Sequence, residues 1–102
     1  ERSYFARGTT NFEQACVLVE NGDWQGASQL WEKELDNYNS KIAGRACYNL
    51  AVMHEINGDL ASAMDWATKS YKEHENKAAL EYLDILKYRS FQNQILEQQV
   101  SR

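Results

Sequence analysis

The chain has 102 residues, 43% of them apolar and 25% charged, and its net charge is −4. This composition is ordinary for one globular domain with its own core, and the mild acidity argues against a nucleic-acid surface, which needs a basic stripe. No run of 18 apolar residues occurs, so we expect no direct membrane insertion by this region. The chain contains no proline, which favours long helices.

The triplet Asn21-Gly22-Asp23 returns 36 residues later as Asn57-Gly58-Asp59. Glycine commonly ends a helix in the left-handed conformation, and aspartate caps the next helix by accepting a backbone hydrogen bond. Each triplet therefore predicts the end of one helix and the start of another, joined by a turn so short that the two helices lie antiparallel. A repeat of this length is typical of stacked helical units.

Apolar residues at helical spacing flank the first triplet. The stripe before it comprises Phe12, Ala15, Cys16 and Val19, and the stripe after it comprises Trp24, Ala27, Leu30, Trp31 and Leu35. Thr10 and Glu13 predict a capping box at the start of the first helix. We expect Tyr4-Phe5 to extend this helix backwards.

The second unit follows the same pattern. Asn39 or Ser40 is expected to cap a helix that runs to Ile56. The stripe after the second triplet comprises Leu60, Ala63, Met64, Ala67 and Tyr71. Asn76 predicts the cap of a last helix from Lys77, whose apolar residues are Leu80, Leu83, Leu86, Ile95 and Leu96.

The segment RACYNLAVMHEINGDLASAMDWATKSY resembles a tetratricopeptide repeat. The residues that carry the resemblance are Asn49, Leu50, Ala51, Gly58, Asp59, Ala63 and Ser70. The first unit is a looser match, with Gln14 in place of the usual leucine and a connection two residues longer than the norm. The resemblance implies an all-α superhelix forming a single domain over 1–102, with repeat one at about 9–38, repeat two at about 43–74 and a long C-terminal capping helix at about 77–98.

The pairing of GDWQGASQLW with YNLAVMHEINGDL also resembles the repeat region of an uncharacterised bacterial cell-envelope family that is lipoprotein-like. In that family the repeats follow a separate N-terminal domain. The chain begins with Glu1 rather than methionine, so we expect a fragment of a longer protein. The resemblance implies a location in the bacterial periplasm or cell envelope.

In tetratricopeptide arrays the first helices of the units line a concave groove that binds peptides or partner helices. Carried over to this chain, the partner-binding positions are Phe12, Cys16, Val19, Arg45, Tyr48, Val52, Glu55 and Ile56, with Thr9 and Glu20 beside them. This strip is either a binding groove or is covered internally, by the last helix or by an N-terminal domain. Phe12 and Cys16 stand where binding of chaperone tails needs Lys and Asn, so that activity is not expected.

No motif points to catalysis, to a cofactor or to a metal site. Cys16 and Cys47 lack the close pairing of zinc ligands and are interpreted as buried apolar residues, with a disulfide as the alternative. His54 is expected in the core, where the family usually packs a tyrosine, and His74 in solvent. The function we expect is a non-enzymatic protein–protein interaction module or scaffold with a protein or peptide partner. The alternative is a structural domain that supports another domain of a larger cell-envelope protein.

Overall fold

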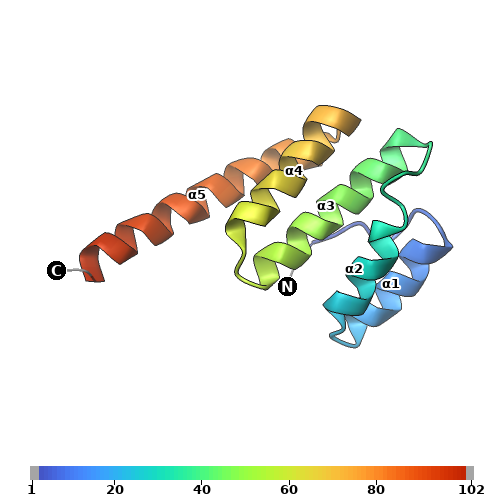
Figure 1. Ribbon diagram of the computed structural model, residues 1–102, viewed down its shortest axis with the longest axis horizontal. Helices are drawn as coiled ribbons and strands as arrows, with labels where there is room; N and C mark the ends of the chain where they lie inside the picture. Colours follow the sequence, from blue (N-terminus) through green and yellow to red (C-terminus); the bar gives the residue numbers. More distant parts are fainter. Residues whose placement is uncertain (1–2, 101–102) are drawn as a thin grey trace.

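The computed structural model describes residues 3–100, with the side chains of residues 3–98, and within this range the chain forms five helices. They are α1 (Thr10–Glu20), α2 (Trp24–Glu32), α3 (Ser40–Ile56), α4 (Leu60–His74) and α5 (Lys77–Val100). The all-α fold is therefore confirmed. Helices α1 and α2 form one antiparallel pair, α3 and α4 form a second, and α5 packs against α4 (Figure 1).

The two Asn-Gly-Asp triplets form the predicted turns. Gly22 and Gly58 have φ of 81° and 82°, the left-handed region in which a Cβ is strained. Asp23 and Asp59 then each accept a hydrogen bond from the backbone N–H three residues further on, at 2.8 and 3.0 Å. Local chemistry thus ends α1 and α3 and starts α2 and α4, as the sequence predicts.

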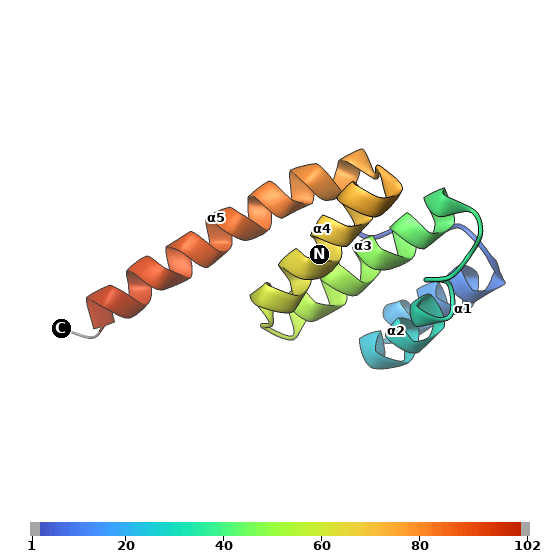
Figure 2. The ribbon, with the colours of Figure 1, turned by 45° about the horizontal axis from the view of Figure 1, so that its top comes forward.

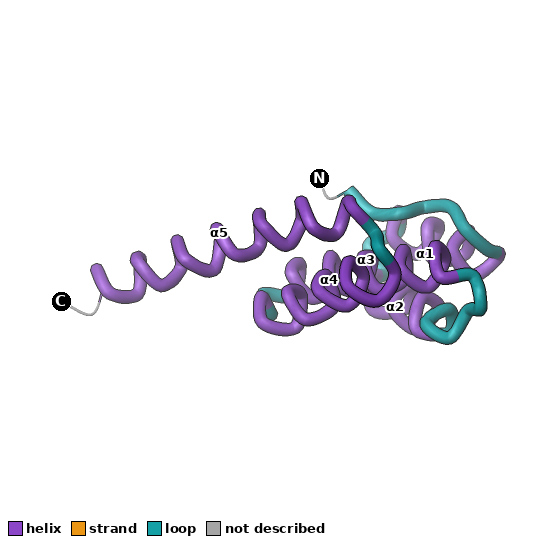
Figure 3. Tube along the Cα trace, turned by 90° about the horizontal axis from the view of Figure 1, so that it is seen from above, coloured by secondary structure: helices purple, strands orange, loops and turns teal. Residues whose placement is uncertain are grey.

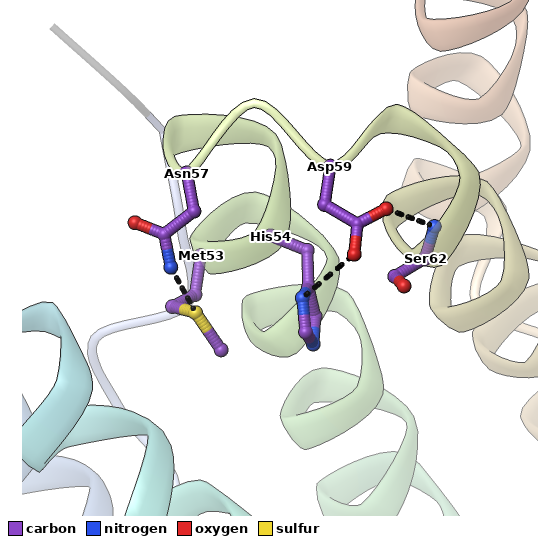
Figure 4. Close-up of polar contacts among 5 residues, drawn as sticks. All are labelled: Met53, His54, Asn57, Asp59 and Ser62. Atoms are coloured by element: carbon purple, nitrogen blue, oxygen red, sulfur yellow. Dashed lines mark hydrogen bonds and ion pairs between the residues drawn. The ribbon is translucent and has the colours of Figure 1, made fainter.

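Figure 4 shows the second turn, where Asp59 lies between two helices. Its carboxylate accepts the backbone N–H of Ser62. The Ser62 side chain, followed by this backbone N–H, lowers the pKa of Asp59. The other carboxylate oxygen lies 3.9 Å from Nδ1 of His54. His54 is half-buried at the end of α3, so the expectation of a core position is wrong.

The N-terminal segment, residues 3–9, is extended and does not continue α1, so the expected backward extension through Tyr4-Phe5 is wrong. The cap of α1 is Thr9, not Thr10: its backbone is extended and its hydroxyl accepts the N–H of Phe12. The helix begins only after this cap, and Figure 3 shows the segment as a loop that leads into α1.

Helix α2 ends at Glu32, earlier than the predicted stripe through Leu35 implies. The following turn buries the carboxylate of Glu34, which accepts a hydrogen bond from the hydroxyl of Thr9. The amides of Asn11 and Asn37 donate to the same carboxylate at 3.2 and 3.1 Å. These hydrogen bonds lower the pKa of Glu34 and join the start of α1 to the end of the first unit.

Two apolar clusters form the core. The first packs α1, α2 and α3 around Phe12 and Trp31, and the second packs α3, α4 and α5 around Leu83 and Leu86. Alanines at the helix contacts let the backbones approach closely; those with no exposed surface include Ala15, Ala27, Ala46, Ala51, Ala63 and Ala67. Leu80, expected on the packed stripe of the last helix, is 39% exposed.

Helix α5 runs on past the second unit and extends away from α3 and α4 (Figures 1 and 2). The 36-residue spacing of the triplets places Asn93, Gln94 and Ile95 where a third Asn-Gly-Asp turn would stand. Without the glycine and the capping aspartate nothing ends the helix, so α5 continues to Val100.

Candidate interaction surface

The N-terminal segment lies across α3, and Asn49 holds its backbone. The N–H of Phe5 donates to Oδ1 of Asn49, and Nδ2 of Asn49 donates to the carbonyl oxygen of Phe5, both at 2.7 Å. The Asn49 side chain has no exposed surface. A single buried amide therefore satisfies both backbone groups of one extended residue, which is how a side chain can bind a peptide of any sequence.

The ring of Tyr4 points to the first helix pair. It meets Trp24 edge-on with centroids 5.5 Å apart and lies 6.0 Å from Trp31. Its hydroxyl donates to Sγ of Cys16 at 3.3 Å. Burial, followed by the contact with Cys16, raises the pKa of Tyr4 to about 12.

The ring of Phe5 points instead to α3. It meets Tyr48 edge-on at 5.0 Å, and the guanidinium of Arg45 stands 5.1 Å from its centroid. Arg45 also donates to the carbonyl oxygen of Arg7 at 3.2 Å. The neighbouring aromatic residues of the segment thus fill two separate pockets on the helices.

The structure separates the eight predicted partner-binding residues into two groups. Phe12, Val52 and Glu55 are buried, and the first two expose 0% and 2% of their surface. The half-buried residues are Cys16, Val19, Arg45, Tyr48 and Ile56. Three of them contact the N-terminal segment at two separate places, Cys16 at Tyr4, and Arg45 and Tyr48 at Phe5. Val19 and Ile56 pack beside the two core clusters. The predicted strip is therefore covered in part by the chain itself.

An open cleft of about 280 Å³ remains between α3 and α5. Its walls are Ser3, Tyr48, Val52, Glu55, Tyr82, Ile85 and Arg89. The carboxylate of Glu55 accepts the hydroxyl of Tyr82 at 2.7 Å and pairs with the guanidinium of Arg89. The Tyr82 ring lies 5.1 Å from that of Tyr48, and burial, with a smaller effect of Glu81, raises the pKa of Tyr48.

Beyond the cleft, α5 exposes an apolar face that sequence reasoning missed. Ile85, Tyr88 and Phe91 are 47%, 63% and 57% exposed. The 36-residue spacing aligns these three with Asn49, Val52 and Glu55 of α3. In this face, defined here as the α5 face, Tyr88 and Phe91 thus fall in register with Val52 and Glu55 of the predicted strip. The signal that could have revealed it is Asn93, which falls in register with Asn21 and Asn57.

A second hollow, of about 420 Å³, lies where the ends of α3, α4 and α5 meet. In it Oγ of Ser40 lies 2.7 Å from Nδ1 of His74, which is half-buried at the end of α4. A hydrolytic serine–histidine pair also needs a carboxylate on the other ring nitrogen, and none of the described residues supplies one there. The hydrogen bond between Ser40 and His74 joins the start of α3 to the end of α4.

The chemistry available elsewhere is limited. Cys16 and Cys47 are both free thiols, and burial raises the pKa of Cys47 to about 11, which keeps it protonated at neutral pH. Within residues 3–100 no three His, Cys, Asp or Glu side chains are grouped so that they could hold a metal ion. None of the helices described is long and apolar enough to cross a membrane.

Comparison with known proteins places the chain in a family. No curated protein and no solved structure matches the chain significantly. The family described as "Domain of unknown function (DUF6340)" matches residues 13–90, which include α2, α3, α4, most of α1 and the packed part of α5. The chain therefore belongs to the DUF6340 family.

Proposed function

We propose that this domain is a non-enzymatic protein–protein interaction module or scaffold that uses the concave face of a tetratricopeptide-like helical array. Its partner is a protein or a peptide. The observation that carries the proposal is the α5 face, where Tyr88 and Phe91 are exposed in register with Val52 and Glu55 of the strip on α3.

The arrangement of the helices supports the proposal. Two antiparallel pairs joined by Gly-Asp turns, followed by a longer helix, are what the resemblance to tetratricopeptide repeats implies. Stacked units of this kind present their first helices side by side on one face, and such faces commonly bind other polypeptides. Here α3 and α5 meet at the open cleft that Tyr48 and Ile85 line.

The exposure on α5 is selective. On the same helix Leu83 and Leu86 are buried against α3 and α4, whereas Tyr88 and Phe91 are more than half exposed. Aromatic side chains contribute strongly to binding when a partner removes them from water. The pair of exposed aromatic residues on α5 is therefore the anchor that we propose for a partner.

A site-specific crosslinking experiment tests the proposal. A photoreactive phenylalanine analogue is placed at Tyr88, and in a control chain at Val17, which is also exposed but lies on α1. We expect a discrete protein adduct from position 88 that disappears in the Phe91→Asp variant and does not form from position 17. Equal adducts from both positions, or none from position 88, would contradict the proposal.

The alternative, a structural domain that supports another domain of a larger cell-envelope protein, is favoured by the coverage of the α3 strip by the N-terminal segment and α5. The same experiment separates the two functions if it is done in the longer protein. A crosslink to another domain of the same chain leaves the mass unchanged, whereas a separate partner adds its own mass.

A further inference from the structure

We propose that the N-terminal segment occupies a peptide-binding site on its own chain (in cis), and that the same site binds an extended peptide with two adjacent aromatic residues from another molecule (in trans). The site is the surface formed by Asn49, Arg45 and Tyr48 of α3 and by the pocket that receives Tyr4. The inference rests on the proposed function, because it names a ligand class for the same concave face.

The backbone contacts are those of a bound peptide. Phe5 has no helical or sheet partner, and both its N–H and its carbonyl oxygen bond to the Asn49 side chain. Two residues further on, the carbonyl oxygen of Arg7 accepts a hydrogen bond from Arg45. These three hydrogen bonds use only backbone groups of the segment, so they hold an extended chain without regard to its sequence.

The side-chain contacts supply the selectivity. Successive side chains of an extended chain point to opposite sides, and here Tyr4 and Phe5 enter different pockets. The first pocket receives an aromatic ring edge-on to Trp24 and tilted against Trp31, and offers the Cys16 sulfur to a hydroxyl. The second pairs a ring with Tyr48 under the cation of Arg45. Two adjacent aromatic residues, the first a tyrosine, satisfy both pockets at once.

The segment is also separable from the helices. Thr9 caps α1 from its own side chain, so the start of α1 does not depend on residues 3–7. Arg7 and Gly8, which join the segment to this cap, are exposed. The short tether gives the segment an effective concentration in the millimolar range. A free peptide therefore binds weakly to the unaltered chain, because it must displace the tethered copy.

The test uses the full chain with Tyr4→Ser and Phe5→Ser, which weakens the segment in cis without shortening the protein. The probe is a fluorescent peptide, ERSYFARGT, with the sequence of residues 1–9, and binding is followed by fluorescence anisotropy. We expect the double variant to bind this peptide at least about tenfold more tightly than the unaltered chain does. Adding Asn49→Ala to the double variant should weaken binding by roughly tenfold, since two hydrogen bonds are lost.

Two controls locate the site. Asn93→Ala in the same background removes an exposed amide of α5 and should leave binding unchanged. A peptide with alanine in place of its phenylalanine should bind about tenfold more weakly. The inference is overturned if the double variant melts cooperatively yet binds no peptide at millimolar concentration, or if Asn49→Ala leaves binding unchanged.

Hydrogen exchange on the unaltered chain keeps the inference testable even if the double variant does not fold. A segment that leaves its site locally lets the Phe5 amide exchange at least about tenfold faster than the amide of buried Leu50. Equal protection of the two amides would show that the segment opens only with the whole domain, and would overturn the inference. Neither experiment uses the α5 face, so failure here is distinct from failure of the proposed function.

Discussion

The replacement of Asn49 by alanine is expected to loosen the N-terminal segment while leaving the five helices folded. Asn49 is fully buried, and its amide makes two hydrogen bonds of 2.7 Å to the backbone of Phe5. Alanine can replace neither of them. The loss therefore falls on a contact between parts of the chain that are 44 residues apart.

The size of the effect follows from three contributions. Two ordinary hydrogen bonds together contribute about 1–3 kcal/mol to the free energy of unfolding. The higher helix propensity of alanine offsets about 0.6 kcal/mol of their loss. If the Phe5 backbone stayed in place without a partner, each group would cost a further ~1–3 kcal/mol. The segment avoids that cost by moving into water, so we expect a net loss of about 0.4–2.4 kcal/mol, or a fall in Tm of roughly 2–20 °C for a domain of this size.

Urea unfolding and exchange of the Phe5 amide measure the two parts of this effect. The Asn49→Asp variant is the matched control, because its shape is the same but a carboxylate cannot donate to the carbonyl oxygen of Phe5. Protonation restores a donor, so we expect Asn49→Asp to regain stability relative to Asn49→Ala as the pH falls. An unchanged unfolding midpoint with an unchanged exchange rate of Phe5 in Asn49→Ala would refute the reasoning.

Three further outcomes follow from the structure. The folded-state pKa of Glu34 lies below its ordinary value of 4.5. The contribution of the Glu34 carboxylate to the free energy of unfolding is therefore complete above about that pH and is lost as the pH falls through the folded pKa. The difference in stability between the unaltered chain and Glu34→Gln should narrow in acid, and a constant difference in their urea midpoints would contradict this. The pKa of Tyr4 is raised from 10.0 to about 12. The neutral phenol therefore stabilises the fold below pH 10, and this stabilisation is lost as the pH rises towards 12. The Tm of Tyr4→Phe should lack this alkaline decline, and an equal dependence of Tm on pH in the two proteins would contradict the reasoning. Leu86→Ala should lower the free energy of unfolding by about 2–5 kcal/mol, because Leu86 is fully buried. Leu80→Ala should lower it by about 1 kcal/mol or less, because that side chain is 39% exposed. Similar urea midpoints for the two variants would be inconsistent with the packing of α5.

The parts of the fold that depend on neighbouring residues could be predicted from the sequence. The turns at Gly22 and Gly58 were predicted because a left-handed glycine and a capping aspartate act within a few residues. The prediction of a helix through Tyr4-Phe5 is wrong because the Phe5 backbone bonds to Asn49 instead, a residue 44 positions away that local patterns do not reveal. The early end of α2 has the same cause, since Glu34 is bound by Thr9, 25 residues away.

The candidate surface was predicted only in part. The residues of the strip on α3 were identified, but their exposure could not be, because it depends on how the N-terminal segment and α5 lie over them. The exposed residues Tyr88 and Phe91 were missed because they lie on an apparently featureless continuation of the last helix. The sequence singles out this part of the last helix only through Asn93, which lies 36 residues after Asn57 of the second turn.

The uninterrupted α5 also bears on how such an array can change in length. The third turn lacks its glycine and its aspartate, because Gln94 and Ile95 stand at those two positions. Helix α5 already packs against α4, as α3 packs against α2. Gln94→Gly with Ile95→Asp would supply the left-handed residue and the cap that the earlier turns use. An array of this kind can therefore grow by duplication of its last helix and the repair of one turn, with no redesign of the existing core.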